Sequence, residues 1–100
     1  MKNGKRLELI AHLVAKPGKE AALAQAMLAI VPDVEQEPGC IAYVPHVSRE
    51  QPGKIVMYEV WTDEAAHAAH VEGPSVARLR SRFDELLAAP LRTEWLHRIG

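Results

Sequence analysis

The chain has 100 residues, about the length of a single domain. Its 12 lysines and arginines balance 13 aspartates and glutamates, and this net charge of −1 excludes a nucleic-acid binder that depends on a basic surface. Hydrophobic residues make up 48% of the sequence, but many are alanine and only 5% of the chain is aromatic. The apolar core that one copy can build is therefore lean, which predicts that a second copy supplies part of it.

The sequence has the pattern of a cytoplasmic protein. Its one cysteine, Cys40, cannot form an internal disulfide, which fits a reducing compartment. No apolar run approaches the ~20 residues of a membrane span, so we expect no membrane partner. Residues 7–15 follow a basic start but are interrupted by Glu8 and His12, so they are predicted to be a strand of the mature protein rather than part of a signal peptide. We expect a single domain over residues 1–100, frayed over residues 1–5.

Hydrophobic periodicity predicts a strand and then a helix at the start of the domain. Residues 7–15 alternate, and both of their faces are largely apolar, so both faces are expected to be covered. Residues 19–37 carry apolar side chains every three or four positions, as on an amphipathic helix. Pro32 lies within this run and is expected to kink the helix or end it near Val31.

The rest of the chain is predicted to form two strands, two helices and a strand. Residues 40–48 and 54–62 flank a Pro-Gly loop as in a hairpin, and Pro45 marks an edge position or a bulge. The predicted helices span residues 64–71 and 75–88, the second capped by Ser75, and residues 91–99 alternate as a final strand.

The order β-α-β-β-α-α-β predicts an α+β, ferredoxin-like split βαβ fold with an antiparallel sheet. The helices of such a fold cover one face of the sheet. The other face, with residues such as Tyr58 or Trp61, then has to be covered by another chain or by a ligand.

Four stretches of the sequence resemble the antibiotic biosynthesis monooxygenase (ABM) family, small dimeric α/β barrels that include quinol monooxygenase-like proteins. The stretches are Lys16-Pro17-Gly18-Lys19-Glu20, Glu37-Pro38-Gly39-Cys40-Ile41-Ala42-Tyr43, Tyr58-Glu59-Val60-Trp61-Thr62-Asp63-Glu64-Ala65 and Ala69-His70-Val71-Glu72-Gly73-Pro74. Their spacing is kept over nearly the whole chain, so the resemblance extends to the single domain.

The resemblance implies a homodimer in which two four-stranded sheets pack face to face into a dimeric α/β barrel. Oxygenases of this family use no metal, flavin or haem, so the resemblance implies that no cofactor is needed. The electron-rich aromatic substrate, once deprotonated, itself reduces molecular oxygen. The protein then has to bind a flat phenol or hydroquinone, remove a proton and hold the anion.

Glu59, Trp61 and His70 are the candidate catalytic residues. Glu59 and Trp61 project from one face of their strand and match the Tyr-Glu-x-Trp stretch of the family. A carboxylate among apolar side chains is a candidate proton acceptor; alternatively, Glu59 pairs with an arginine across the dimer while Trp61 only packs. His70 lies where the family often has a histidine, and it either handles a proton and substrate or forms a hydrogen bond that fixes its helix to the sheet.

His12, Tyr43, Tyr58 and His67 are the candidate substrate-binding residues. His12 lies in mid-strand, where it either belongs to the core or lines the cavity. The tyrosines can pack while they present their hydroxyl groups. His67 shares a helix face with His70, but two ligands do not define a metal site and no third stands nearby in the sequence, so we expect no bound metal.

Two departures from the patterns of family members bear on function. Haem-degrading members use an asparagine on the first strand and a histidine ligand on the second helix. The corresponding positions here are Ala11 and Arg80, which argues against haem degradation. The polyketide oxygenases of the family use an asparagine and a tryptophan together, and the only asparagine here is Asn3, which counts against carrying that pair over.

These observations predict an oxidoreductase: a cofactor-independent monooxygenase that acts on a quinol or phenolic small molecule with molecular oxygen, in a pocket between sheet and helices. One alternative is a non-oxidative isomerase or degrader of a small signalling metabolite on the same fold. Another is a ligand-binding or stress-associated dimer without turnover. The sequence leaves the three open.

Overall fold

Strands and helices follow one another in the predicted order. The computed structural model describes residues 6–100, and the prediction that residues 1–5 are frayed falls outside the described residues. The elements are β1 (Leu7–Val14), α1 (Glu20–Glu35), β2 (Cys40–Val47), β3 (Lys54–Trp61), α2 (Glu64–Val71), α3 (Pro74–Arg80), α4 (Phe83–Leu86) and β4 (Arg92–Leu96). The α+β, ferredoxin-like fold is confirmed.

The four strands form one antiparallel sheet in the order β2-β3-β1-β4. Pro45 therefore lies on an edge strand, which is where a sheet tolerates a residue without an N–H. The register aligns Leu9 with Glu59 and Ala11 with Met57. Because residues directly opposite each other share a face, Glu59 projects from the same face as the buried side chains of β1.

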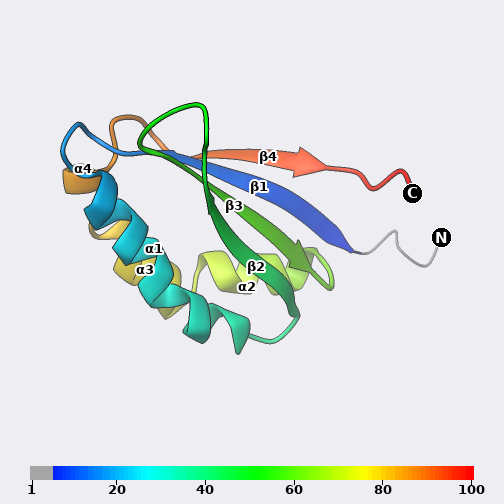
Figure 1. Cartoon of the computed structure of the whole chain (residues 1–100). Helices are drawn as coiled ribbons and strands as arrows, with labels where there is room; N and C mark the ends of the chain where they lie inside the picture. The colour runs from blue at the N-terminus through cyan, green and yellow to red at the C-terminus, as the bar shows by residue number, and fades with distance from the viewer. Residues whose placement is uncertain (1–5) are drawn as a thin grey trace.

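All four helices lie on one side of the sheet (Figure 1). The core between the sheet and the helices is continuous. Helix α1 contributes four buried side chains at helical spacing, Leu23, Met27, Ile30 and Val34. None of the helices within residues 6–100 is both long enough and apolar enough to cross a membrane.

Of the two outcomes expected at Pro32, a kink or an end near Val31, the end is wrong, because helix α1 runs through Pro32 to Glu35. Proline removes the hydrogen bond to the carbonyl four residues earlier. That carbonyl belongs to Leu28, which is 58% exposed, so the missing bond lies on the solvent side of the helix.

The predicted helix over residues 75–88 is two short helices. Ser75 does not cap it; Gly73 is the N-cap of α3 and Pro74 begins the helix, as the fixed φ of proline favours. The break follows Arg80, where the Ser81 hydroxyl donates a hydrogen bond to the Arg78 carbonyl at 2.7 Å. Such side-chain bonds compete with helix continuation.

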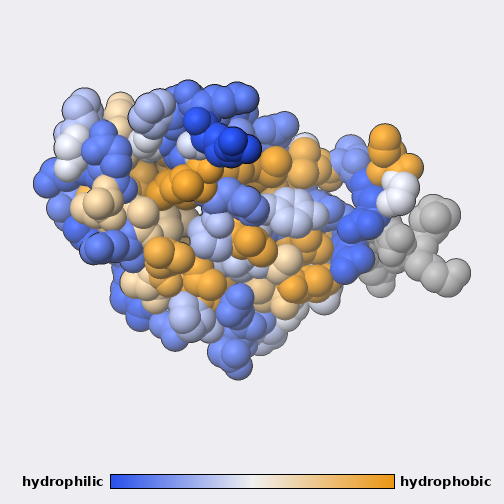
Figure 2. Space-filling model, in the orientation of Figure 1, coloured by the Kyte–Doolittle hydropathy of each residue, from blue (hydrophilic) through white to orange (hydrophobic). Residues whose placement is uncertain are grey.

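Trp61 lies on the helix-covered face, with no exposed surface, so the expectation that it lies on the uncovered face is wrong. Tyr58 does lie on the uncovered face, opposite Ile10. Val44 is opposite Tyr58 and 42% exposed. Figure 2 shows patches of apolar surface among hydrophilic residues on the side of the molecule seen in Figure 1. One face of the sheet is thus open and partly apolar.

Candidate functional site

A cavity of about 400 Å³ lies between the inner face of the sheet and the helices. Most of the side chains around it are apolar, and its polar lining residues are Tyr43, Glu59, His67, His70, Arg80 and Thr93. Val71, Leu91 and Trp95 also line it and are exposed, so the cavity opens to the surface along this edge. An apolar hollow with a few converging polar groups is the usual form of a small-molecule site.

Glu59 is the buried carboxylate of this cavity. Its side chain is 6% exposed, and its Oε1 accepts a hydrogen bond from Trp61 Nε1–H at 3.0 Å. Burial raises the pKa of Glu59 to about 7, opposed by the Trp61 hydrogen bond and supported by the nearby charge of Glu37. Near neutral pH, Glu59 is therefore able both to take up and to give back a proton.

His70 packs into the same corner from α2. Its ring centroid is 4.6 Å from that of Trp61 and 5.3 Å from that of Tyr43, and its Nε2 is 3.9 Å from Glu59 Oε1. Burial lowers the pKa of His70, while its contact with Glu37 opposes the change. Burial disfavours the charged form of both groups, and it therefore opposes a buried ion pair between Glu59 and His70.

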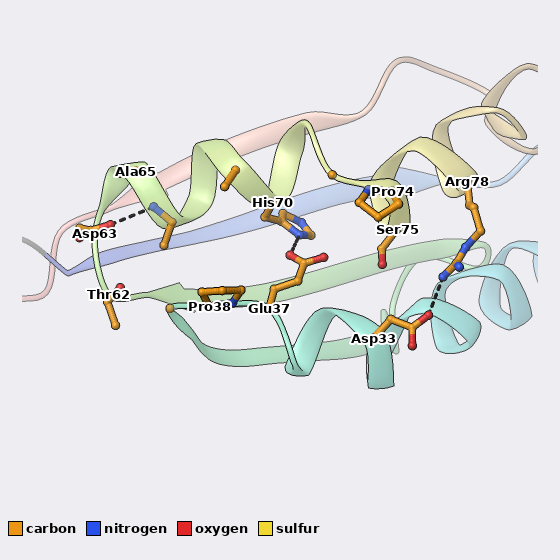
Figure 3. Close-up of a pocket in the computed structure, with 14 residues that line it drawn as sticks. Asp33, Glu37, Pro38, Thr62, Asp63, Ala65, His70, Pro74, Ser75 and Arg78 are labelled. Atoms are coloured by element: carbon orange, nitrogen blue, oxygen red, sulfur yellow. Dashed lines mark hydrogen bonds and ion pairs between the residues drawn. The ribbon is translucent and has the colours of Figure 1, made fainter.

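The second ring nitrogen of His70 contacts Glu37, which precedes β2. His70 Nδ1 lies 2.8 Å from Glu37 Oε1, and Figure 3 shows the two side chains pointing toward each other. A carboxylate oxygen only accepts hydrogen bonds, so we assign the hydrogen to Nδ1. This leaves Nε2 as the nitrogen that faces Glu59.

A close approach of the loop before β2 to α2 makes this contact possible. Gly39 has a φ of +82°, and a Cβ at that position would lie 2.5 Å from Ala66 Cβ and 2.7 Å from Thr62 Oγ1. The Thr62 N–H donates to the Gly39 carbonyl, and Asp63 caps α2 by accepting from the Ala66 N–H at 2.9 Å. Only glycine permits both this conformation and this contact.

The other predicted site residues divide between the two faces of the sheet. His67 and Tyr43 line the cavity. The His67 ring lies 6.0 Å from that of His70 and 5.5 Å from that of Trp95, and burial lowers the pKa of His67. Burial raises the pKa of the Tyr43 hydroxyl, and the charge of Glu59 adds to the effect, so Tyr43 stays protonated.

His12 and Tyr58 lie on the open face, away from the cavity. The Tyr58 hydroxyl donates to Glu8 Oε1 at 2.8 Å, and Arg98 donates to the other oxygen of the same carboxylate. His12 Nε2 is 2.9 Å from Glu94 Oε1. Neither residue lines the cavity that holds Glu59.

Glu37 and Arg80 belong to the site, although the sequence did not predict either of them as a site residue. Glu37 belongs to a Glu-Pro-Gly turn, which on its own predicts only the end of a helix. Arg80 lines the cavity, and its guanidinium donates to the Val71 carbonyl at 3.1 Å. No sequence signal links Glu37 to a histidine 33 residues away; the link depends on the tertiary approach at Gly39.

A second hollow, of about 590 Å³, lies on the surface behind His70 (Figure 3). Its wall includes Glu37, His70 and the exposed ion pair of Asp33 with Arg78 at 2.8 Å. His70 lines both this surface hollow and the inner cavity. Within residues 6–100, no three histidine, cysteine, aspartate or glutamate side chains are grouped as a metal site would require.

The comparisons with known proteins agree on one fold. Protein PA3566 of Pseudomonas aeruginosa is 30% identical, with a TM-score of 0.89 over 97% of each chain. A candidate antibiotic biosynthesis monooxygenase of Nitrosomonas europaea has the same TM-score at 22% identity, over 96% of this chain and 92% of that one. The uncharacterized protein sll1783 of Synechocystis is 25% identical over 79% of this chain, which spans 54% of that protein's length.

The family resemblance is confirmed by a match that covers most of the domain. The description of the matching family is antibiotic biosynthesis monooxygenase, and the match runs over residues 7–82. It includes β1, α1, the β2–β3 hairpin, α2 and α3, and therefore both Glu59 and His70. The chain belongs to the antibiotic biosynthesis monooxygenase family.

Proposed function

We propose that the chain is a cofactor-independent monooxygenase of a quinol or related phenol. The observation that carries the proposal is Glu59, a buried carboxylate with a pKa of about 7, held between Trp61 and His70 on the wall of an apolar cavity. The candidate Nitrosomonas monooxygenase of the same fold supports the reaction class.

In the proposed reaction, the Glu59 carboxylate takes the proton of a phenolic O–H, and the O–H bond breaks to leave a phenolate. A phenolate is a far better electron donor than a phenol, and it reduces oxygen directly. One oxygen atom forms a bond to the ring carbon and the other leaves as water, so that a hydroquinone and O₂ give a hydroxyquinone and H₂O. The substrate supplies all the electrons, and the protein supplies proton transfer and position.

The cavity walls fit a flat ring. Leu9, Met57 and Leu79 are buried apolar side chains of the lining, and they favour an aromatic body over a charged one. The exposed Trp95 and Leu91 stand at the open edge, where substrate and oxygen enter in this proposal.

We propose that two copies pack through their open sheet faces, as members of this family do. Ile10, Val44 and Tyr58 give that face apolar surface, and His12 Nδ1 is buried there without a hydrogen-bond partner among the described residues. A partner chain would cover this apolar surface and supply a hydrogen-bond partner for His12 Nδ1. Light scattering should give the mass of a dimer, and Ile10→Glu should lower it; a monomeric wild-type protein would contradict the pairing.

Oxygen uptake with a panel of hydroquinones tests the proposed reaction. We expect saturable uptake above the autoxidation rate, reduced about 100-fold or more by Glu59→Gln, because removal of a general base costs rates of that order. Glu50→Gln, in the exposed loop after β2, is the matched control and should leave the rate unchanged. If every quinol tested reacts no faster than its autoxidation, the proposal fails.

A non-oxidative isomerase is the second candidate, and the pairing of Glu59 with His70 favours it. Two acid–base groups 3.9 Å apart can remove a proton from one atom of a substrate and return one to another. Removal of oxygen separates the two candidates, because only the monooxygenase then loses turnover. A dimer that binds ligand without turnover would show saturable binding and no product in either condition.

A further inference from the structure

Glu37 lines the surface hollow and contacts His70. His70 lines both the inner cavity and the surface hollow, whereas Glu59 lines only the inner cavity and Glu37 only the surface hollow. The side chains of Glu59 and His70 are both buried, with 6% and 4% of their surface exposed, whereas that of Glu37 is 20% exposed. The three groups therefore lead from a buried carboxylate to a solvent-accessible one.

The contacts along this line are suited to proton transfer. His70 Nδ1–H donates to Glu37 Oε1 at 2.8 Å, which is a short charge-assisted distance. On the other side of the ring, Nε2 is 3.9 Å from Glu59 Oε1. A movement of about 1 Å brings that pair to hydrogen-bond distance. An imidazole can accept a proton on one nitrogen while it releases one from the other.

We propose that Glu59, His70 and Glu37 form a proton path that carries the substrate's proton out of the cavity to the surface hollow, with Glu37 as its exit. This inference rests on the proposed function. Glu59 gives its proton to His70 Nε2, the Nδ1–H proton passes to the Glu37 carboxylate, and Glu37 releases it to water. The relay leaves the imidazole with its hydrogen on Nε2. Exchange with water after the product has left removes that proton and returns one to Nδ1, so no proton is created or lost.

The path is needed because the substrate blocks the alternative. A ring bound in the apolar cavity excludes water from the open edge beside Trp95, so a proton on Glu59 cannot leave on that side. The hollow behind His70 is separate and remains open to water (Figure 3).

Other titratable groups face these three from every neighbouring element. His67 lies beside His70 on α2, Tyr43 and Cys40 face Glu59 from β2, and Arg80 lines the cavity from α3. The Asp33–Arg78 pair lines the surface hollow, and its charges offset each other. Among the described side chains that line the surface hollow, only Glu37 forms a hydrogen bond with His70.

Chemical rescue of Glu37 variants tests the path. Glu37→Ala should lower kcat roughly tenfold or more and leave KM within about twofold, because proton transfer rather than binding is impaired. Formate should restore Glu37→Ala with saturable kinetics, since the hollow can admit a small carboxylate. Glu37→Gln should lose the same activity but resist rescue, because its side chain still fills the space. Asp33→Asn, in the same hollow but out of contact with His70, is the control and should keep full activity.

A loss in Glu37→Ala that formate does not restore would overturn the path, as would full activity in both Glu37 variants. Imidazole nitrogen NMR of the wild-type protein gives a readout that needs no turnover. We expect His70 to carry its hydrogen on Nδ1, with Nε2 bare, at neutral pH; the opposite tautomer would overturn the path. If no quinol is turned over, the proposed function fails while the NMR result still decides the direction of the path.

Discussion

Glu59→Gln should stabilise the folded protein at high pH. Glutamine has nearly the same shape, its amide oxygen can still accept from Trp61 Nε1–H, and it carries no titrating proton. In the wild type, burial raises the pKa of the Glu59 carboxyl from its ordinary value of 4.5 to about 7. At about 1.4 kcal/mol per pKa unit, that difference corresponds to about 3 kcal/mol.

The direction of the effect with pH follows from where each state binds the proton. Between pH 4.5 and 7, Glu59 is protonated in the folded chain and ionised in the unfolded one. At this site the folded state then binds more protons, so the contribution of Glu59 to the free energy of unfolding falls as pH rises through this window. The Glu59→Gln variant has no titrating group at this position and does not lose stability in this way. Its advantage should therefore be absent near pH 4.5, grow through pH 7 and level off at about 3 kcal/mol above pH 8.

Urea denaturation of both proteins at fixed protein concentration, from pH 5 to pH 9, measures the difference directly. His70 is present in both, so its own titration largely cancels. Glu50→Gln, which removes an exposed carboxylate, should show no comparable trend. A difference that stays constant with pH would refute the raised pKa. A wild type that gains stability relative to the Glu59→Gln variant as pH rises from 5 to 7 would show instead that Glu59 is ion-paired, as with an arginine of a partner chain.

Three further substitutions test the frame around the site. Gly39→Ala should lower the free energy of unfolding by more than the ~1 kcal/mol of an ordinary glycine at positive φ, because its Cβ would overlap Ala66. Gly18→Ala should cost no more than that, because a Cβ at position 18 meets nothing within 4 Å. Equal losses in urea denaturation would contradict the close approach at Gly39. Asp63→Ala should cost about 1 kcal/mol of unfolding free energy through the lost helix cap, and an unchanged midpoint would contradict that role. Tyr58→Phe should leave kcat within about twofold, since its hydroxyl lies on the open face; a large loss of turnover would place Tyr58 in the site.

The sequence predicted what depends on local periodicity. The helix over residues 64–71 has the bounds expected from its Thr-Asp-Glu start and Gly-Pro end, and the strands agree to within a few residues at their ends. Alternation in β3 also separates Glu59 from Tyr58, so the position of Tyr58 on the far face was already contained in the pattern. The alternative that Pro32 ends the helix was wrong, and the exposure of Leu28, four residues earlier, is a tertiary property that the local pattern does not give.

The candidate site could be predicted only in part, because its central contacts join distant segments. Strand spacing and family resemblance singled out Glu59, Trp61 and His70, and the structure brings these three together. The contact between His70 and Glu37 was not predicted. It requires the chain at Gly39 to lie against α2, and no local pattern encodes that distance.

The most direct test of the proposed oxygenase is the fate of isotopically labelled oxygen gas. Wild-type protein should be incubated with a hydroquinone that it consumes, under labelled O₂ and then under nitrogen, and the product examined by mass spectrometry. The account predicts one labelled oxygen atom in the quinone product, dependence of its formation rate on Glu59, and no product under nitrogen. Product formed equally well under nitrogen, or formed without label, would contradict it.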